Sequence, residues 1–413
     1  MNDSLSRIDA ALAQPERRPL RPLRVAMVTE TYPPEVNGVA RTVGLMVDGL
    51  RARGHVVQLA RPRQNGSEVA AAEDNFEELL KRGIPIPRYS QLKFGAPAKG
   101  ALVRAWSERP PDIVHIATEG PLGWSALAAA RKLGLPVATD FHTNFHAYSR
   151  HYGFAWLARP VTSYLRAFHN RADCTLVPTA ELAEELGRDG FRGLRVVGRG
   201  VNPAVFSPER RSRELRATWG AADDTPVALC VSRFAPEKNF PLVIRAYEAM
   251  RAVRPETKLV LVGDGPMAEE LRRRLDGLPG HSTGYVIAGR KVNGELSRHY
   301  ASADVFLFPS TTETFGNVTL EAMASGLGIV AYRYAAAREH LAHERSALLP
   351  PLDDEAAFLA AAQRMAREPD LARRLGVAAR IAAESLTWER IADDFEEALV
   401  DVAAEGTLAG VAA

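Results

Sequence analysis

Two carboxylates lie eight positions apart in the segment Pro309–Gly326, which directly follows the apolar run Val305–Phe308. Glu313 falls in the expected loop after a strand, and Glu321 falls in a helix that Gly316 would open. The first N–H groups of a helix lack backbone partners and attract anions. The groups in question belong to Phe315, Gly316, Asn317 and Val318. We therefore expect a phosphate at this helix start with Glu313 beside it, although Glu313 as a capping or solvated residue and Glu321 as a helix-surface acid are equally open.

Two cations lie five positions apart in the segment Ser232–Asn239, which follows the apolar run Val227–Val231. Arg233 and Lys238 flank an expected turn after the strand, so both side chains could reach one diphosphate. An exposed basic turn without a ligand is an equally good interpretation of these two residues alone.

Three further residues follow expected strands. Gly38 comes after the run Leu23–Val28, and its missing Cβ lets the backbone approach an anion closely. Gly263 lies in a Gly-x-Gly-x-x-Ala pattern, but we disfavour a dinucleotide site because no acid follows on the next strand at the required spacing. His142 follows the run 137–141, and this position favours a functional role over a structural one.

Short β-branched runs alternate with helical patterns along the whole chain, which predicts parallel sheets covered by helices. The series starts at residue 23 and starts again at residue 227, so we predict an α/β fold of two doubly wound, Rossmann-like domains. The expected divisions are a disordered tail at 1–21, a first domain at 22–205 and a second domain at 206–385. A final helix at 386–405 should pack back on the first domain. Its apolar stripe consists of Trp388, Ile391, Phe395 and Leu399.

Composition excludes several classes of protein. No run approaches the length of a membrane span, and residues 1–21 lack the apolar centre of a secretory signal. Cys174 and Cys230 are the only cysteines, so no disulfide framework is expected, and a reducing cytoplasmic location fits. The first 200 residues carry 27 Lys and Arg against 20 Asp and Glu, whereas the remainder carries 25 against 30. A basic half favours an anionic partner, although ordinary surface variation is equally open. Nucleic acid is disfavoured because the basic residues are dispersed.

The glutamate pair with seven residues between its members resembles the signature of family 4 retaining glycosyltransferases, which have the GT-B fold. Four other segments match that family in the same order, and the resemblance covers residues 22–400. They are Thr31–Val39, Asp140–His146, Ser232–Asn239 and Val262–Pro266. The resemblance implies that the two domains face a cleft that holds a nucleoside diphosphate sugar.

The resemblance also implies a role for each matching residue. Arg233 and Lys238 would bind the donor diphosphate, Glu313 the sugar and Glu321 the ribose. The remaining matches are His142 near the transferred sugar, Gly38 and Gly263 near the nucleotide, and the helix start at residues 315–318. The chain departs from the family in two places. Asn37–Gly38 replaces a pair of glycines, and Tyr334–Glu339 replaces a Gly-Gly pair followed by Glu, so the role of the second loop stays open.

The acceptor side depends on the stretch His146–Arg171, in which six aromatic residues alternate with arginines. Such a mixture suits a bilayer interface, and a core helix with a solvated basic face is equally open. This stretch resembles the sulfoquinovosyl, glucuronosyl and mannosyl transferases that glycosylate diacylglycerol-type lipids. The resemblance implies a lipid acceptor and peripheral attachment to the anionic inner face of the membrane. Glu119, Tyr148 and Arg150 would border the acceptor pocket.

The sequence therefore predicts a retaining hexosyltransferase that moves a hexose from GDP-mannose or a UDP-hexose to a lipid. No Asp-x-Asp motif stands beside Arg233 and Lys238, so we expect no cofactor and no obligatory metal. The alternatives are a glycosyltransferase with a soluble or polysaccharide-precursor acceptor, a sugar-nucleotide epimerase, and a noncatalytic nucleotide-sugar-binding protein. The sequence does not predict an oligomeric state.

Overall fold

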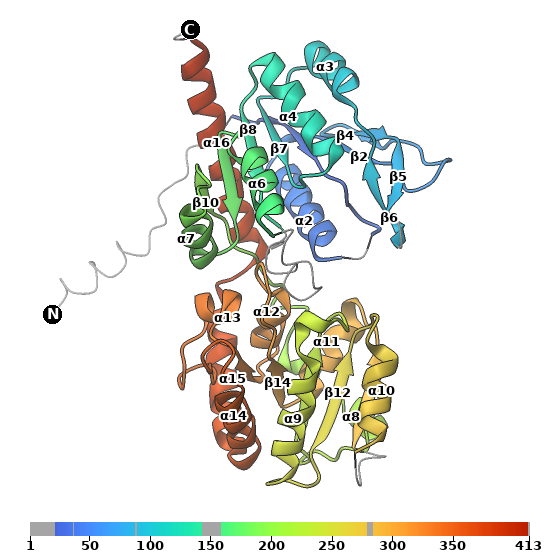
Figure 1. The fold of residues 1–413 in the computed structure, drawn as a ribbon, viewed down its shortest axis with the longest axis vertical. Coiled ribbons are helices and arrows are strands. Elements are labelled where there is room, and N and C mark those ends of the chain that lie inside the picture. The colour runs from blue at the N-terminus through green and yellow to red at the C-terminus, as the bar shows by residue number, and fades with distance from the viewer. Residues whose placement is uncertain (1–20, 36, 87–88, 143–157, 279–283, 412–413) are drawn as a thin grey trace, which may run out of the picture.

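The computed structural model describes residues 21–35, 37–86, 89–142, 158–278 and 284–411. These residues form two α/β domains that lie end to end, as Figure 1 shows. In the first domain, the strands of the main sheet follow the order β10-β9-β8-β7-β1-β2-β4-β3 and are parallel except for β3. Their bounds are β1 Arg24–Val28, β2 Val56–Pro62, β3 Ala72–Glu73, β4 Phe76–Lys81, β7 Ile113–Ile116, β8 Val137–Asp140, β9 Cys174–Val177 and β10 Leu194–Val196.

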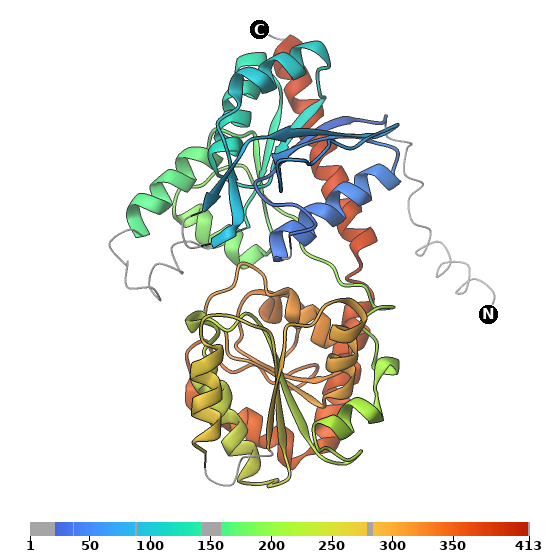
Figure 2. The same ribbon diagram turned by 90° about the vertical axis from the view of Figure 1, so that its right-hand side faces the viewer.

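The sheet of the second domain is parallel throughout and has the order β13-β12-β11-β14-β15. Its bounds are β11 Val227–Val231, β12 Lys258–Val262, β13 Tyr285–Gly289, β14 Val305–Phe308 and β15 Gly328–Ala331. Helices cover both faces of this sheet (Figure 2). The helices of this domain are α8 Arg213–Thr218, α9 Phe240–Arg251, α10 Ala268–Asp276, α11 Asn293–Ser302, α12 Asn317–Ala324, α13 Ala335–His340, α14 Glu355–Arg367 and α15 Pro369–Glu384.

The apolar strands of the second domain are buried on both faces because helices lie above and below them. In β11, Val227, Leu229 and Val231 join one hydrophobic cluster, and Ala228 and Cys230 join the other. Successive side chains of a strand point to opposite faces, so an unbroken apolar run supplies both clusters. This explains why the run was recognisable as a central parallel strand.

The first domain carries helices on its main sheet and receives the last helix of the chain. Its helices are α2 Gly38–Ala52, α3 Lys99–Glu108, α4 Pro121–Leu133, α6 Ala158–His169 and α7 Ala180–Arg188. The final helix, α16 Trp388–Val411, places Ile391, Phe395 and Leu399 in one cluster with Val25 and Met27 of β1. The chain thus returns to the first domain at its end (Figure 1).

The two chain crossings between the domains lie side by side. The Val201 N–H donates to the Leu386 carbonyl at 2.8 Å, and Val201 pairs with Thr387 in an isolated parallel bridge. A Cβ at Gly200 would lie 2.8 Å from the Trp388 nitrogen, so only glycine permits this approach. The crossings therefore form one compact connection.

The region from residue 72 to residue 95 differs from the sequence interpretation, which assigned no strand there. It contains β3, β4 and the hairpin of β5 Gly83–Ile86 with β6 Tyr89–Gly95. Most of β4 is only half buried, and Pro85 lies inside β5. In β4 neither the alternation of a half-buried strand nor an apolar run was present, and Pro85 weakened the strand pattern of β5.

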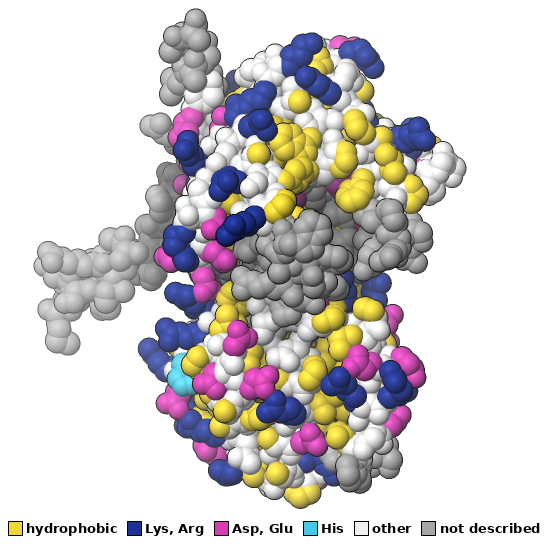
Figure 3. Space-filling view, in the orientation of Figure 1, with side chains coloured by type: hydrophobic (Ala, Val, Ile, Leu, Met, Phe, Trp, Pro, Cys, Tyr) yellow, Lys and Arg dark blue, Asp and Glu magenta, His cyan; other side chains and the backbone are white. Residues whose placement is uncertain are grey.

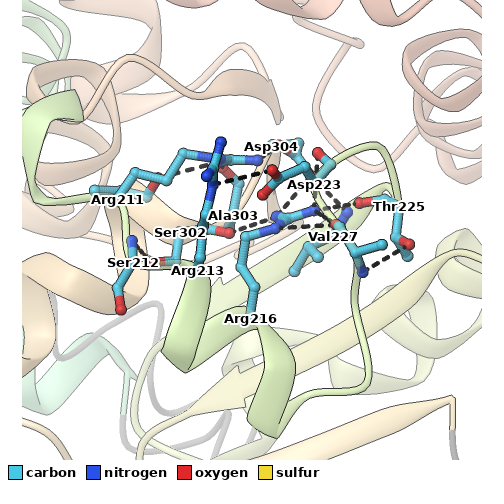
Figure 4. Close-up of polar contacts among 12 residues, drawn as sticks. Arg211, Ser212, Arg213, Arg216, Asp223, Thr225, Val227, Ser302, Ala303 and Asp304 are labelled. Carbon is cyan, nitrogen blue, oxygen red and sulfur yellow. Dashed lines mark hydrogen bonds and ion pairs between the residues drawn. The ribbon is translucent and has the colours of Figure 1, made fainter.

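A buried arginine secures the end of the second sheet that lies away from the first domain (Figure 4). Arg216 of α8 is 1% exposed and donates to the carbonyls of Ser302 at 2.7 Å and Thr225 at 2.6 Å. Its guanidinium also pairs with Asp304 at 3.2 Å. Asp304 in turn accepts a hydrogen bond from the Val227 N–H at the start of β11. Arg216 thus ties α8 to the amino-terminal edges of β11 and β14.

We expect Arg216→Met to lower the free energy of unfolding by roughly 3 kcal/mol, because it leaves buried carbonyls and a carboxylate without their donor. Urea denaturation should measure this loss. The matched control is Arg213→Met, which removes an exposed ion pair with Asp223 and should cost less than about 1 kcal/mol. Equal stability of the two variants would contradict the structural role of Arg216.

Candidate active site

The second sheet reverses its winding between β11 and β14, and ligands of such sheets bind at the carboxyl ends of the strands at this point. The loop after β11 supplies Lys238, and the loop after β14 supplies Glu313. Lys238 Nζ lies 2.5 Å from Glu313 Oε1, with side chains 12% and 14% exposed. The fold therefore brings together two predicted site residues that are 75 positions apart in sequence.

Arg233 lies in the same loop as Lys238. Its guanidinium is 47% exposed and pairs at 2.7 Å with the fully buried carboxylate of Glu237. The Glu237 carbonyl accepts hydrogen bonds from the Ser310 hydroxyl and the Thr311 N–H, both in the loop after β14. Glu237 thus joins the two loops and orients Arg233 toward solvent beside Lys238.

The helix start expected at Gly316 is present. Gly316 has φ 92°, which favours glycine, and α12 begins at the next residue without a side-chain cap. Within the described parts of the chain, no hydrogen-bond acceptor is found for the N–H groups of Phe315, Gly316 and Asn317. These groups remain available to an anion beside Glu313. The Phe315 side chain itself is buried in the core.

Glycines shape the loops around this point. A Cβ at Gly263 would lie 1.9 Å from the Ser232 carbonyl oxygen, and one at Gly265 would lie 2.5 Å from that of Phe234. Both glycines therefore let the loop after β12 pack against the loop that carries Arg233. Gly38 is exposed at the start of α2, where the Asn37 side chain accepts the Ala40 N–H as an N-cap. Asn37 thus stabilises the helix at one of the two positions where family members have glycines.

His142 of the first domain reaches the second domain through its backbone, because the Thr314 hydroxyl donates to its carbonyl at 3.0 Å. Behind it, Asp140 Oδ2 lies 3.1 Å from His142 Nε2, and Asp140 Oδ1 accepts from Arg199 at 3.0 Å. All three side chains are at most 5% exposed. Burial by itself would raise the pKa of Asp140, but the charges of His142 and Arg199 hold it far below its ordinary value.

Two ion pairs join the two domains near His142 and Glu313. Arg41 of α2 lies 2.8 Å from Glu321 Oε1, and Arg338 of α13 pairs with Glu181 of α7. Glu321 is therefore not a helix-surface acid, because its side chain is only 7% exposed. Burial raises the pKa of Glu321, and the charge of Arg41 opposes this shift.

The loop Tyr334–Glu339, which departs from the family pattern, carries the contact between Arg338 and Glu181. Glu181 Oε2 accepts the Ala335 N–H at 3.1 Å, while the Tyr334 hydroxyl donates to the Glu313 carbonyl at 2.9 Å. Ala335 has φ 49°, a conformation that glycine adopts at lower cost. Tyr334 and Ala335 thus connect Glu313 to the first domain.

The residues expected at the acceptor side are only partly described. Glu119 is 8% exposed, lies 3.3 Å from His169 Nε2, and accepts the Tyr164 hydroxyl at its carbonyl. Tyr148 and Arg150 lie outside the described residues. In α6, Phe168 is fully buried and Tyr164 is 44% exposed, so this helix contributes to both the core and the surface.

The sequence interpretation missed five residues that hold the site: Arg41, Asp140, Glu181, Arg199 and Tyr300. The hydrogen bond of Arg199 to Asp140 spans 59 positions, and the bond of Arg41 to Glu321 spans 280. No local signal marks such pairs. Only Asp140 offered a hint, because it ends a strand two residues before His142.

Neither a metal cluster nor a membrane-spanning helix is found in the described structure. No three His, Cys, Asp or Glu side chains among the described residues lie together as metal ligands. Likewise, none of the described helices is long and apolar enough to cross a bilayer.

Two family models match the chain: Glycosyltransferase Family 4 over residues 36–205 and Glycosyl transferases group 1 over residues 225–368. A GDP-mannose-dependent alpha-mannosyltransferase of Mycolicibacterium smegmatis is 33% identical over 376 residues, which are 90% of this chain and 96% of that protein. The chain belongs to glycosyltransferase family 4. The resemblance seen in the sequence is thereby confirmed, and this protein is a glycosyltransferase.

Two further proteins resemble this glycosyltransferase, one in sequence and one in fold. An alpha-monoglucosyldiacylglycerol synthase of Streptococcus pneumoniae is 29% identical over 318 residues, 75% of this chain and 71% of that protein. The crystal structure of Anabaena HepE in complex with UDP and glucose superimposes with a TM-score of 0.71 at 18% identity, covering 92% of this chain and 100% of HepE. The predicted fold class, two doubly wound domains of the GT-B type, is confirmed.

We expect Asp140→Asn to lower the free energy of unfolding by about 3 kcal/mol at pH 7, because it leaves the Arg199 charge buried without its partner. The pKa of Asp140 is depressed in the folded state, so its stabilisation is present above the ordinary Asp value of about 4 and is lost as the pH falls below it. Urea denaturation at several pH values should show that the difference in the free energy of unfolding between wild type and variant decreases in acid.

The control for this prediction is Asp401→Asn, which removes a surface pair with Arg195 and should cost less than about 1 kcal/mol. A gap between wild type and Asp140→Asn that stayed constant down to low pH would show that the carboxylate charge is not what stabilises this cluster.

Proposed function

We propose that this glycosyltransferase moves a hexose from a nucleoside diphosphate sugar to a diacylglycerol-type lipid, with retention of configuration at the anomeric carbon. The observation that carries the proposal is the pairing of Lys238 with Glu313 beside the open helix start at Gly316. A cation, an acid and free N–H groups meet at one point, as a charged leaving group attached to a sugar requires.

The donor diphosphate would lie between Lys238, Arg233 and the start of α12. Departure of the nucleoside diphosphate concentrates negative charge on its terminal phosphate, and fixed positive groups stabilise this charge in the transition state. Because two side-chain cations and a helix start supply the positive potential, the proposal includes no obligatory metal and no cofactor.

The sugar would lie between the two domains, with Glu313 accepting hydrogen bonds from its hydroxyls. His142 would lie on its other side, since the Thr314 bond holds the His142 backbone next to the Glu313 loop. In a retaining reaction of this kind, the acceptor hydroxyl attacks from the face that the phosphate leaves. A departing phosphate oxygen then takes the proton, so no base from the protein is needed.

The relatives support the choice of substrates. The mannosyltransferase of Mycolicibacterium smegmatis is dependent on GDP-mannose, and HepE binds UDP and glucose. The donor proposed here is accordingly GDP-mannose or a UDP-hexose. The relative from Streptococcus pneumoniae is a glucosyldiacylglycerol synthase, and its match to 75% of this chain supports a diacylglycerol-type acceptor.

A transfer assay tests this proposal directly. Each labelled donor is incubated with the enzyme alone, with diacylglycerol in detergent, and with a soluble sugar acceptor, all in the presence of a chelator. Labelled glycolipid with the donor's anomeric configuration supports the proposal. Product on the soluble acceptor only would overturn the lipid acceptor. Epimerised donor without transfer would overturn the transferase reaction, and activity that only magnesium restores would overturn the absence of an obligatory metal.

The surface of the first domain predicts peripheral attachment to an anionic membrane. On the face formed by α4 and α6, hydrophobic side chains adjoin Lys and Arg side chains (Figure 3). Tyr164 is 44% exposed there, and the guanidinium of Arg171 lies 5.3 Å from the centre of the Trp124 ring. Cations beside partly exposed aromatic rings suit the headgroup region of a bilayer.

We expect the protein to sediment with phosphatidylserine-containing vesicles at low salt and to be released as the salt concentration rises. Arg159 is exposed on α6, and Arg150 lies just before this helix, outside the described residues. Each cation near the surface contributes about 1 kcal/mol, so replacing both with Gln should weaken binding roughly thirtyfold. Arg245→Gln in the second domain is the control and should bind normally. No sedimentation at low salt would favour a soluble acceptor.

A further inference from the structure

The ion pair between Arg41 and Glu321 connects the first domain to the helix expected to hold the nucleotide. Arg41 projects from the first turn of α2, three residues after Gly38, and its NH1 group donates to Glu321 Oε1 at 2.8 Å. The Arg41 side chain is 49% exposed, whereas the Glu321 side chain is 7% exposed. Arg41 therefore reaches from an open surface to a buried carboxylate.

Two rings fix the geometry of this pair. The Tyr300 hydroxyl of α11 donates to Glu321 Oε2 at 3.0 Å, and Tyr300 is fully buried. Phe206, in the connection between the domains, packs edge-on against Tyr300 at 5.7 Å and lies 6.0 Å from the Arg41 guanidinium. Glu321 is thus held by Arg41 of α2 and Tyr300 of α11, and both of these side chains lie against the buried ring of Phe206.

The other ion pair between the domains, Arg338 with Glu181, is more exposed to water. Arg338 and Glu181 are 50% and 23% exposed, so water screens them, and their pair would hold the domains together weakly. A buried carboxylate opposite a partly exposed arginine requires the arginine more strongly, because losing the partner leaves an uncompensated buried charge. Arg41 therefore stabilises the buried charge of Glu321 in addition to joining the two domains.

The remaining hydrogen-bonding capacity of Glu321 fits a ribose. A carboxylate has about four acceptor positions, two on each oxygen. Arg41 occupies one position on Oε1 and Tyr300 occupies one on Oε2. Counting donors from the described residues only, one position on each oxygen remains, which matches the two adjacent hydroxyls of a ribose.

We propose that Arg41 is a positioning residue of the donor site, which holds the Glu321 carboxylate charged and oriented to accept both ribose hydroxyls. The proposal rests on the proposed function and on the position of the ribose at Glu321 that the family resemblance implies. Arg41 thereby makes the first domain a part of the nucleotide site, so that nucleotide binding favours the arrangement in which the two domains meet.

Titration calorimetry tests the proposal with GDP, UDP and their 2′,3′-dideoxy analogues on wild type, Arg41→Gln and Arg41→Lys. Arg41→Gln should bind the preferred nucleotide about tenfold more weakly, the effect of losing one charge-assisted hydrogen bond. It should also lose most of the preference for the ribose form over the dideoxy form. Arg41→Lys keeps the charge, so it should retain part of the nucleotide affinity and part of the preference for the ribose form. Arg51→Gln on the same helix breaks a pair with Glu73 and should behave as wild type.

The dependence on pH gives a second readout that a purely structural role would not produce. The charged and titratable groups facing Glu321 among the described residues are Arg41 from α2 and Tyr300 from α11. Burial raises the pKa of Glu321 and Arg41 lowers it, so removing Arg41 raises it further. Nucleotide affinity of Arg41→Gln should therefore recover as the pH rises, while that of wild type changes less.

The outcomes are distinguishable. Unchanged affinity and unchanged ribose preference in Arg41→Gln would overturn the proposal, and tighter binding would show that Arg41 competes with the ribose. Glu321→Gln separates the two claims. If Glu321→Gln binds GDP and UDP as wild type does, the ribose does not lie at Glu321, and the proposed donor site fails together with this inference. Thermal melting of each variant verifies that it is folded.

Discussion

Parallel strands bring all of their carboxyl ends to one edge of a sheet, and in this protein the loops at two such edges, one from each domain, contact each other. The loops after β11 and β14 bring Lys238 to within 2.5 Å of Glu313, and the loop after β8 brings His142 to the same place. Every group in the proposed mechanism lies at the end of a strand or the start of the following helix. The chemistry thus depends on the direction of the strands more than on any single contact.

Much of this arrangement was visible in the sequence because it is local. The fully apolar runs of β11 and β14 marked buried strands, and the residues that follow them, Lys238 and Glu313, were recognisable from type and spacing. Gly316 was recognisable as a helix start and has the positive φ that this role requires. Strand, loop and helix start are each encoded within about ten residues.

The remainder of the site was not predictable because it is made by contacts between distant segments. Arg41 and Glu321 are 280 positions apart, and Arg199 and Asp140 are 59 positions apart. The strand β4 was missed for another reason. Its residues are mostly half buried and lack alternation, so only its pairing with β2 makes it a strand.

The proposed mechanism depends above all on Lys238, which neutralises the diphosphate as it leaves. The most direct measurement is the transfer rate of Lys238→Ala at saturating donor, with the free energy of unfolding measured in parallel and with Lys99→Ala, on the exposed start of α3, as the control. We predict a loss of turnover of about 100-fold or more, as for other groups that stabilise transition-state charge, while the free energy of unfolding falls by about 1 to 3 kcal/mol because Glu313 loses its partner, and the variant stays folded. Near-normal turnover in this variant would contradict the account.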